Sequence, residues 1–275
     1  MAFTINTNLF SVDAQRNLSI TQGSLATAME RLSSGLKINS AADDPAGFEI
    51  ASIMTSQING LTTATSNANN AVSLVQTTEG GLSTISDMLQ RMNELAVQAA
   101  DSVNTTSNLS ALNSEFTSLI SEIDRVAGSS TFNGQHILDG TGPATWTFQV
   151  GADNSANDEI TLAGLTATST ALGVSALTIS SQTAAQSAIS TVQSAINTIN
   201  VDQGNVGAIN NRLNYAISNL GNMVQNLTAA KSRVTDADFA SETANMTKDM
   251  ILQQAGISVL AQANSIPQQI LKLLP

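Results

Sequence analysis

The sequence predicts a mainly α-helical protein: an elongated helical bundle with long coiled-coil terminal helices and a small β-hairpin region. First, apolar residues recur at alternating steps of three and four along most of the chain, as in helices packed lengthwise on one another. Second, the 275 residues are 42% hydrophobic but only 3% aromatic, so the core must be aliphatic. Third, one central segment alternates apolar and polar residues, as strands do.

Three seams of apolar residues predict long helices. They span residues 61–99, 109–126 and 206–234, and each keeps its heptad spacing throughout. Asp44 followed by Pro45 is typical of an N-cap and a first helical residue, so a helix is expected to begin there. Alanine at many seam positions lets helix axes approach closely, which favours a rod-shaped bundle.

Both ends of the chain carry amphipathic helices, each with one narrow apolar stripe. Such a helix is marginally stable alone, because nucleation is costly and tertiary packing supplies most helix stability. We therefore expect both ends to be largely disordered in the isolated subunit. They should become helical only against each other and against neighbouring subunits. The stripe residues are Ile5, Leu9, Val12, Leu18, Leu25, Met29 and Leu32 at one end, and Leu252, Val259, Ile266, Ile270 and Leu273 at the other.

The segment from about residue 130 to 184 follows a different pattern. Apolar and polar residues alternate over 146–150 and again over 160–162. A turn-rich stretch separates these two runs, so one hairpin is expected there. A further strand at 177–179 is an open alternative, and the remainder is expected to be loop.

Composition argues against most enzymes and against nucleic-acid binding. The chain has no cysteine and one histidine, His136, which leaves no thiolate nucleophile and no histidine pair for a metal. The net charge is −11, and no lysine or arginine occurs between residues 126 and 211, so no basic face is available for phosphates. The stretch Asp153–Asp158 lacks the glycine and glutamate of a calcium loop and is expected to be a polar turn. We expect no catalytic residue, no cofactor, no metal and no nucleic-acid partner.

The sequence shows no sign of a membrane span or of a cleaved leader. The first ten residues, MAFTINTNLF, lack a positive start and a continuous apolar stretch. Polar residues interrupt every apolar run well before about 18 residues, the length that suggests a spanning helix. We expect no membrane insertion, and either a cytoplasmic protein or one exported without a cleaved leader.

Long segments of the chain resemble bacterial flagellins. The resemblance covers about 1–152 and 190–275, and the matching segments are long and specific. The matching segments are RLSSGLKINSAADDPAGFEIA (31–51), LQRMNELAVQA (89–99), EIDRVAGSSTFNGQHIL (122–138), FQVGA (148–152) and nearly all of 219–275.

This resemblance implies an architecture and a function. Residues 1–43 and 236–275 would form a terminal coiled-coil domain lining the core of a filament. Residues 44–235 would form a surrounding helical bundle, with 130–184 as its hairpin and short variable surface segment in place of large outer domains. The chain would be a secreted structural subunit that self-assembles into the flagellar filament used for swimming.

The resemblance also implies partners. These are an export chaperone at the C-terminal segment, the flagellar cap, the hook-junction proteins and the animal innate immune receptor for flagellin. The residues that match the receptor-facing surface are Gln90, Arg91, Glu94, Leu95 and Glu115. Each could equally be an ordinary contact between subunits or part of a solvated helix face.

Two alternatives stay open beside the filament subunit. A minor flagellin or a hook–filament junction protein would share the terminal seams. A secreted effector acting mainly on host receptors belongs to a different class, and filament formation by the purified chain would argue against it. A metalloprotease insertion is excluded, because the chain has a single histidine.

Overall fold

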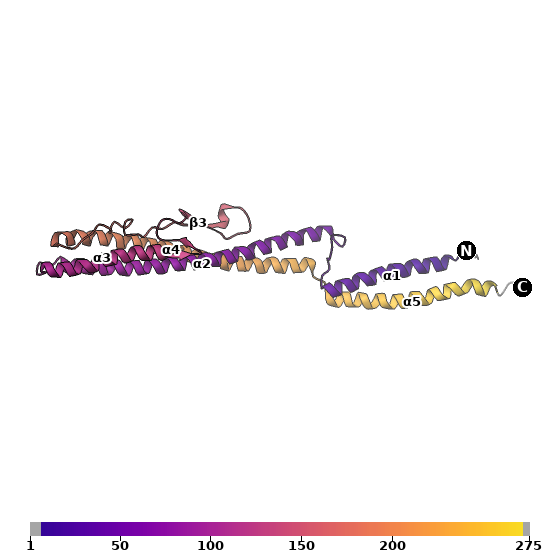
Figure 1. Cartoon of the computed structure of the whole chain (residues 1–275). Helices are drawn as coiled ribbons and strands as arrows, with labels where there is room; N and C mark the ends of the chain where they lie inside the picture. The colour runs from indigo at the N-terminus through magenta and orange to yellow at the C-terminus, as the bar shows by residue number, and fades with distance from the viewer. Residues whose placement is uncertain (1–6, 272–275) are drawn as a thin grey trace. The chain divides into compact units, whose positions relative to one another are not determined.

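The computed structural model describes the backbone of residues 7–271 and the side chains of residues 7–266 (Figure 1). The chain divides into two compact units, one formed by the chain up to Ser56 and from Asn226 onward, the other by residues 57–225. The elements in chain order are α1 (Leu9–Ser34), α2 (Pro45–Ala99), α3 (Thr106–Ser129), β1 (Thr131–Phe132), β2 (Gln135–His136), β3 (Thr145–Gln149), a 3-10 turn (Ala156–Asp158), β4 (Glu159–Ala163), α4 (Gln182–Thr235) and α5 (Phe239–Leu271). The prediction of a mainly α-helical chain with a small β region is confirmed.

The core of the unit 57–225 lies between α2, α3 and α4, which run lengthwise beside one another (Figure 1). Every position of the predicted seam over 61–99 is buried, with at most 3% of any side chain exposed. Phe116 and Ile123 of the second seam are fully buried against it. Helix α4 begins well before its predicted seam, and its early turns add buried small and aliphatic residues. These are Ala185, Ala188, Val192, Ala195 and Ile199.

Two side chains of α3 hold the connection that leads from β4 back to α4. The carboxylate of Asp124 accepts hydrogen bonds from the backbone N–H and the hydroxyl of Ser169, both at 2.8 Å. The Oδ1 of Asn113 accepts the backbone N–H of Ile179 at 2.8 Å. The alternative strand at 177–179 is therefore wrong, because this backbone is bonded to a side chain rather than to a neighbouring strand.

The predicted hairpin is present. Strands β3 and β4 pair antiparallel, with Trp146 opposite Leu162 and Phe148 opposite Ile160. A second, shorter hairpin of β1 and β2 was not predicted. Its two-residue turn is Asn133-Gly134, with φ of 50° and 77°, the left-handed conformation that this dipeptide favours in tight hairpins.

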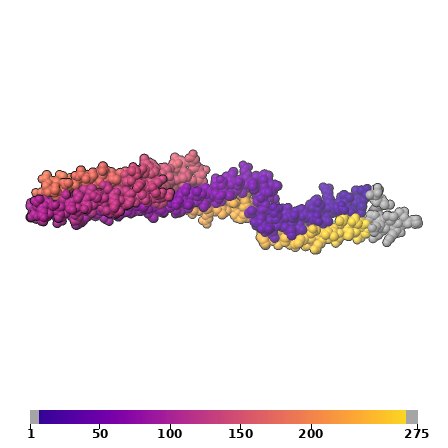
Figure 2. All heavy atoms as spheres, in the orientation of Figure 1, coloured from indigo at the N-terminus to yellow at the C-terminus, as the bar shows by residue number. Residues whose placement is uncertain are grey.

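In the other unit, α1 and α5 lie side by side along their length, indigo and yellow in Figure 2. Helix α1 ends at Gly35, whose φ of 73° forms the left-handed C-cap. The segments beyond the two helices pair briefly: Lys37 N–H donates to Thr235 O at 2.7 Å, and Ala237 N–H donates to Gly35 O at 2.9 Å. Backbone hydrogen bonds therefore join α1 and α5 where α1 ends and α5 begins.

Candidate functional site

The most deeply buried side chains of the contact between α1 and α5 are small. Ser11, Ala14 and Ala28 of α1 and Ala263 of α5 are buried there, each at most 9% exposed. A Cβ atom at Gly256 would lie 3.4 Å from the Leu18 Cδ1 atom, so the Leu18 side chain packs against α5 at this glycine. Shielded positions follow the 3-4 spacing of a coiled coil on both helices. On α5 these include Glu242, Met246, Asp249, Gln253, Gly256, Leu260 and Ala263.

Polar contacts fix the register of this pair. Near its open end, the Asn8 side chain donates to Ala263 O at 2.8 Å, and the Ser11 hydroxyl donates to Asn264 Oδ1 at 2.8 Å. Near the other end, Arg31 forms an ion pair with Glu242 at 3.2 Å. These contacts at both ends specify which turns of the two helices face each other.

The large apolar residues of the predicted stripes lie mostly outside this seam. Among them, Leu18, Leu25, Leu32 and Ile266 are half-buried. Ile5 and Leu273 lie outside the described residues, as does the side chain of Ile270. The remaining stripe residues are exposed: Leu9 62%, Val12 54%, Met29 53%, Leu252 45% and Val259 58%.

Further exposed apolar side chains extend this surface. Sequence reasoning did not select Phe10, Ile20, Phe239, Ile251 or Ile257, which are between 53% and 66% exposed. The sequence nevertheless indicates them, because both end segments contain more apolar residues than one heptad seam can bury. The three consecutive apolar residues from Met250 to Leu252 are an example. So many exposed large apolar side chains on two helices indicate a protein–protein interface.

An open groove of about 240 Å³ follows part of the seam. Ala14, Leu18, Leu252, Gly256 and Val259 all line it. Three members of the predicted stripes thus meet at one place, from both chain ends. We call the exposed and half-buried apolar residues of α1 and α5 the terminal apolar surface.

A second candidate surface lies on α2 and α3, within the unit 57–225. The Arg91 guanidinium contacts Glu94 on its own helix and Glu115 on α3, each at 2.9 Å. The hydrogen bonds that Arg91 donates to the carboxylates of Glu94 and Glu115 raise the pKa of Arg91. Gln90 is also exposed, whereas Leu95 is fully buried in the core. The structure therefore brings four of the five predicted residues to one surface and places Leu95 beneath it.

His136 and the stretch Asp153–Asp158, considered as metal ligands from the sequence, make local structural contacts instead. The Nδ1 atom of His136 lies 3.2 Å from Asp139 Oδ2. The stretch Asp153–Asp158 forms the turn of the β3–β4 hairpin, where the Ser155 hydroxyl accepts the N–H of Asn157. Within the described part of the chain, no group of three or more acidic, histidine or cysteine side chains is placed to hold a metal ion. No helix among the described residues has the length and hydropathy needed to cross a membrane.

Two family models match the chain. The bacterial flagellin N-terminal helical region matches residues 5–142, and the bacterial flagellin C-terminal helical region matches residues 189–274. The chain belongs to the bacterial flagellin family. This flagellin is 42% identical to the flagellin of Halalkalibacterium halodurans over 270 aligned residues. The alignment covers 98% of this chain and 99% of that relative.

Two further comparisons agree. The flagellar filament 33 kDa core protein of Treponema phagedenis is 40% identical over 286 residues, with 98% of this chain and 99% of the relative covered. The crystal structure of Bacillus cereus flagellin superimposes with a TM-score of 0.52 at 30% identity, over 56% of this chain and 88% of that one. As a flagellin, the protein is a structural subunit that assembles with copies of itself into the extracellular flagellar filament.

Proposed function

We propose that this flagellin builds its filament by packing the terminal apolar surface against the same surface of neighbouring copies. The observation that carries the proposal is the exposure of large apolar side chains on α1 and α5, while the side chains buried most deeply between these helices are alanine and serine. Removing aliphatic side chains from water is the main favourable term in association. A single subunit cannot bury these side chains within its own α1–α5 contact, so neighbouring copies must do so.

We expect the filament to grow by adding subunits to a preformed end, because apolar burial must outweigh the entropy lost when the chain ends become ordered. Ordering the two chain ends costs conformational entropy, and the narrow seam of one subunit offsets little of it. At a filament end, neighbouring copies already present fixed apolar partners. The disorder of both ends in the isolated subunit stays a prediction, and it explains why seeds would accelerate assembly.

The proposed domain roles rest on the family resemblance and are compatible with this mode of packing. Residues 1–43 and 236–275 would line the filament core as paired helices, and residues 44–235 would surround them. The short segment within 130–184 would leave a filament without large outer domains.

Matched valine substitutions test the apolar contact. Val259→Ser removes an exposed side chain of the terminal apolar surface, and Val103→Ser removes an even more exposed one, at 79%, between α2 and α3. We expect Val259→Ser to slow seeded elongation by about tenfold or more, because about 1–2 kcal/mol of apolar burial is lost. Val103→Ser should elongate normally. Light scattering and electron microscopy measure both, and equal rates for the two variants would refute the role of the terminal apolar surface.

The same assay separates the major subunit from the alternatives. A major flagellin elongates seeds without any other protein, and we propose that this chain does so. A minor flagellin or a hook–filament junction protein would join an end without extending it, and a secreted effector would not polymerise.

We also propose that the surface formed by Gln90, Arg91, Glu94 and Glu115 contacts the animal innate immune receptor. The ion pairs hold three of these side chains in a fixed arrangement that a receptor could recognise. Leu95 would act only by packing beneath them. Contacts with the export chaperone, the cap and the hook-junction proteins belong to this proposal through family resemblance alone.

A reporter-cell assay tests the receptor surface. Arg91→Ala and Glu115→Ala are expected to weaken signalling by about tenfold, since each removes a charge-assisted contact. Arg125→Ala is the matched control, because Arg125 is an exposed arginine on α3 whose only ion pair among the described residues is with Glu122 on the same helix, at 2.6 Å. Signalling that is unchanged in the first two variants would remove this surface from consideration.

A further inference from the structure

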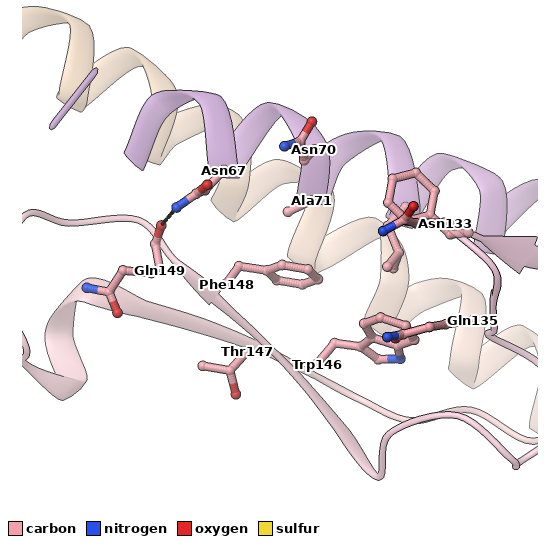
Figure 3. A pocket seen from close by; sticks show the side chains of 11 residues that line it. Asn67, Asn70, Ala71, Asn133, Gln135, Trp146, Thr147, Phe148 and Gln149 are labelled. Carbon is pink, nitrogen blue, oxygen red and sulfur yellow. Dashed lines mark hydrogen bonds between the residues drawn. The ribbon is translucent and has the colours of Figure 1, made fainter. Parts of the chain in front are cut away.

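A hollow of about 390 Å³ lies between α2 and the β strands in the unit 57–225 (Figure 3). Its volume falls in the range of small-molecule sites, about 300–1,000 Å³. The filament-building surfaces described above do not include it. Its lining is dominated by aromatic rings and carboxamides, with Ala71, Leu74 and Thr147 between them, and contains no charged residue.

The aromatic part comes from the two hairpins. Trp146 and Phe148 are two residues apart on β3, so both point to the same face of the strand, and Figure 3 shows them extending toward α2. Phe132 of β1 completes this wall. The chain has one tryptophan and seven phenylalanines, so a chain poor in aromatic residues concentrates several of them around one opening. All three are half-buried, which leaves part of their surface to a ligand.

The polar part consists of Asn70 on α2, Asn133 in the β1–β2 turn and Gln135 on β2 (Figure 3). All three are exposed, and their carboxamides make no hydrogen bond to any described residue. Each carboxamide offers two donors and one acceptor oxygen. Together they present several unused hydrogen-bonding groups beside the aromatic wall.

The strand that carries the aromatic wall is held in place without a ligand. Asn67 of α2 donates to Gln149 O at 3.4 Å (Figure 3), and Val150 N–H donates to Asp158 O at 2.7 Å across the hairpin. A site of this kind loses little conformational freedom on binding, which favours affinity.

We propose that this hollow binds a neutral saccharide. A pyranose ring has an apolar C–H face and a rim of hydroxyl groups that both donate and accept hydrogen bonds. The C–H face would pack on the Trp146 indole and the Phe148 ring, and the hydroxyls would bond to Asn70, Asn133 and Gln135. A charged ligand would find no counter-charge in the lining, and a wholly apolar ligand would make no use of the hydrogen-bonding groups of the carboxamides.

The single tryptophan makes the test site-specific. The probes are the methyl glycosides of glucose, galactose, mannose and N-acetylglucosamine, added to full-length depolymerised protein. Trp146 fluorescence and saturation-transfer NMR report binding. We expect at least one glycoside to bind with a dissociation constant of about 1 mM, as weak sugar sites do.

Matched double variants locate the site. Asn70→Ala with Gln135→Ala removes two carboxamides from the hollow, and we expect about tenfold weaker binding. Gln76→Ala with Gln193→Ala removes two exposed carboxamides of α2 and α4 outside the hollow and should leave binding unchanged. Circular dichroism confirms that both variants fold.

Three results would overturn the proposal. The first is that no glycoside binds at about 100 times the expected dissociation constant. The second is that both double variants bind equally well, since binding would then lie elsewhere. The third is that the hollow variant fails to elongate seeds while no glycoside binds, which would make the hollow a contact between copies. Loss of filament growth in Val259→Ser bears only on the filament proposal, so the two proposals fail independently.

Discussion

Single carboxylates in this flagellin stabilise local backbone turns. The Asp44 carboxylate accepts the N–H of Gly47 at 3.1 Å and caps α2, as the sequence predicts. Its neighbour Asp43 instead accepts the backbone N–H groups of Ser40 and Asn39, which lowers the pKa of Asp43. This stabilisation is present above the usual pKa of an aspartate and is lost as the pH falls through the lowered value. Two adjacent and identical side chains therefore serve different turns.

The pKa of Asp202 on α4 is shifted in the opposite direction to that of Asp43. Burial raises its pKa, so the folded chain keeps the proton up to a higher pH than the unfolded chain does. The charged form therefore destabilises the fold at neutral pH. We expect Asp202→Asn to raise the Tm at pH 7, and this gain to shrink as the pH falls through the raised pKa.

Thermal unfolding followed by circular dichroism from about pH 3 to pH 8 measures this effect. Asp87→Asn, at an exposed position of α2, is the control. If Asp202→Asn changed the Tm by the same amount at every pH, desolvation of the carboxylate would not be the cause.

At the scale of secondary-structure elements, adjacent glycines of α2 face different surroundings. A Cβ atom at Gly81 would lie 2.6 Å from Leu138 Cδ1 and 3.0 Å from Ser130 Oγ, whereas a Cβ atom at Gly80 meets nothing within 4 Å. Alanine within a helix is about 1 kcal/mol better than glycine. Only at Gly80 is that gain available without displacing a neighbour.

We therefore expect Gly80→Ala to increase the free energy of unfolding by about 1 kcal/mol. Gly81→Ala should gain nothing or destabilise, because Leu138 and Ser130 must move. Denaturant unfolding compares the two variants. An equal gain at both positions would show that the chain leaving α3 is not packed tightly on α2.

The helices were predictable from the sequence where one face is buried along a neighbour. The seam over 61–99 is such a case, since a strict apolar repeat leaves only one way to pack. The β3–β4 hairpin was equally clear from alternation. The first half of α4 was missed because its buried face uses Ala185 and Ala188, which hydrophobic patterns weigh lightly. The β1–β2 hairpin was missed although Asn133-Gly134 is a strong turn signal, because each of its strands has only two residues.

The surfaces were only partly predictable. Leu95 sits among exposed matching residues in the sequence, and its burial depends on which side of α2 faces the core. The pairing of Arg91 with Glu115 joins two helices, and no local spacing predicts it. The hollow beside Trp146 needs a turn, a strand and a helix in one place, which sequence periodicity does not describe.

At the scale of the whole molecule, the two units rely on different packing. The unit 57–225 has a core of large apolar side chains, with Leu82, Ile85, Phe116 and Leu213 fully buried. The α1–α5 contact buries mainly alanine and serine. Buried area determines most of the hydrophobic stabilisation, so the first unit is expected to be stable in a free subunit and the second to depend on its neighbours.

Removal of residues 252–275 tests this difference. We expect the truncated chain to remain soluble and helical, because the core of the unit 57–225 is untouched. It should not add to filament seeds, because Leu252, Val259 and the residues beyond are absent. Sedimentation, circular dichroism and seeded growth measure these properties, with the full-length chain as control. Addition of the truncated chain at the full-length rate would contradict the proposed assembly surface.

The seam between α1 and α5 has a consequence for how this protein can change. Its most deeply buried side chains are alanines and a serine, while Leu9, Val12, Leu252 and Val259 stay exposed. A free-standing coiled coil instead buries its large aliphatic side chains along the seam. The solubility of the free subunit and the stability of the filament therefore depend on the same side chains in opposite ways. A mutation that makes these side chains more polar raises the solubility of the free chain but weakens the filament. A mutation that makes them more apolar strengthens the filament but promotes aggregation before assembly.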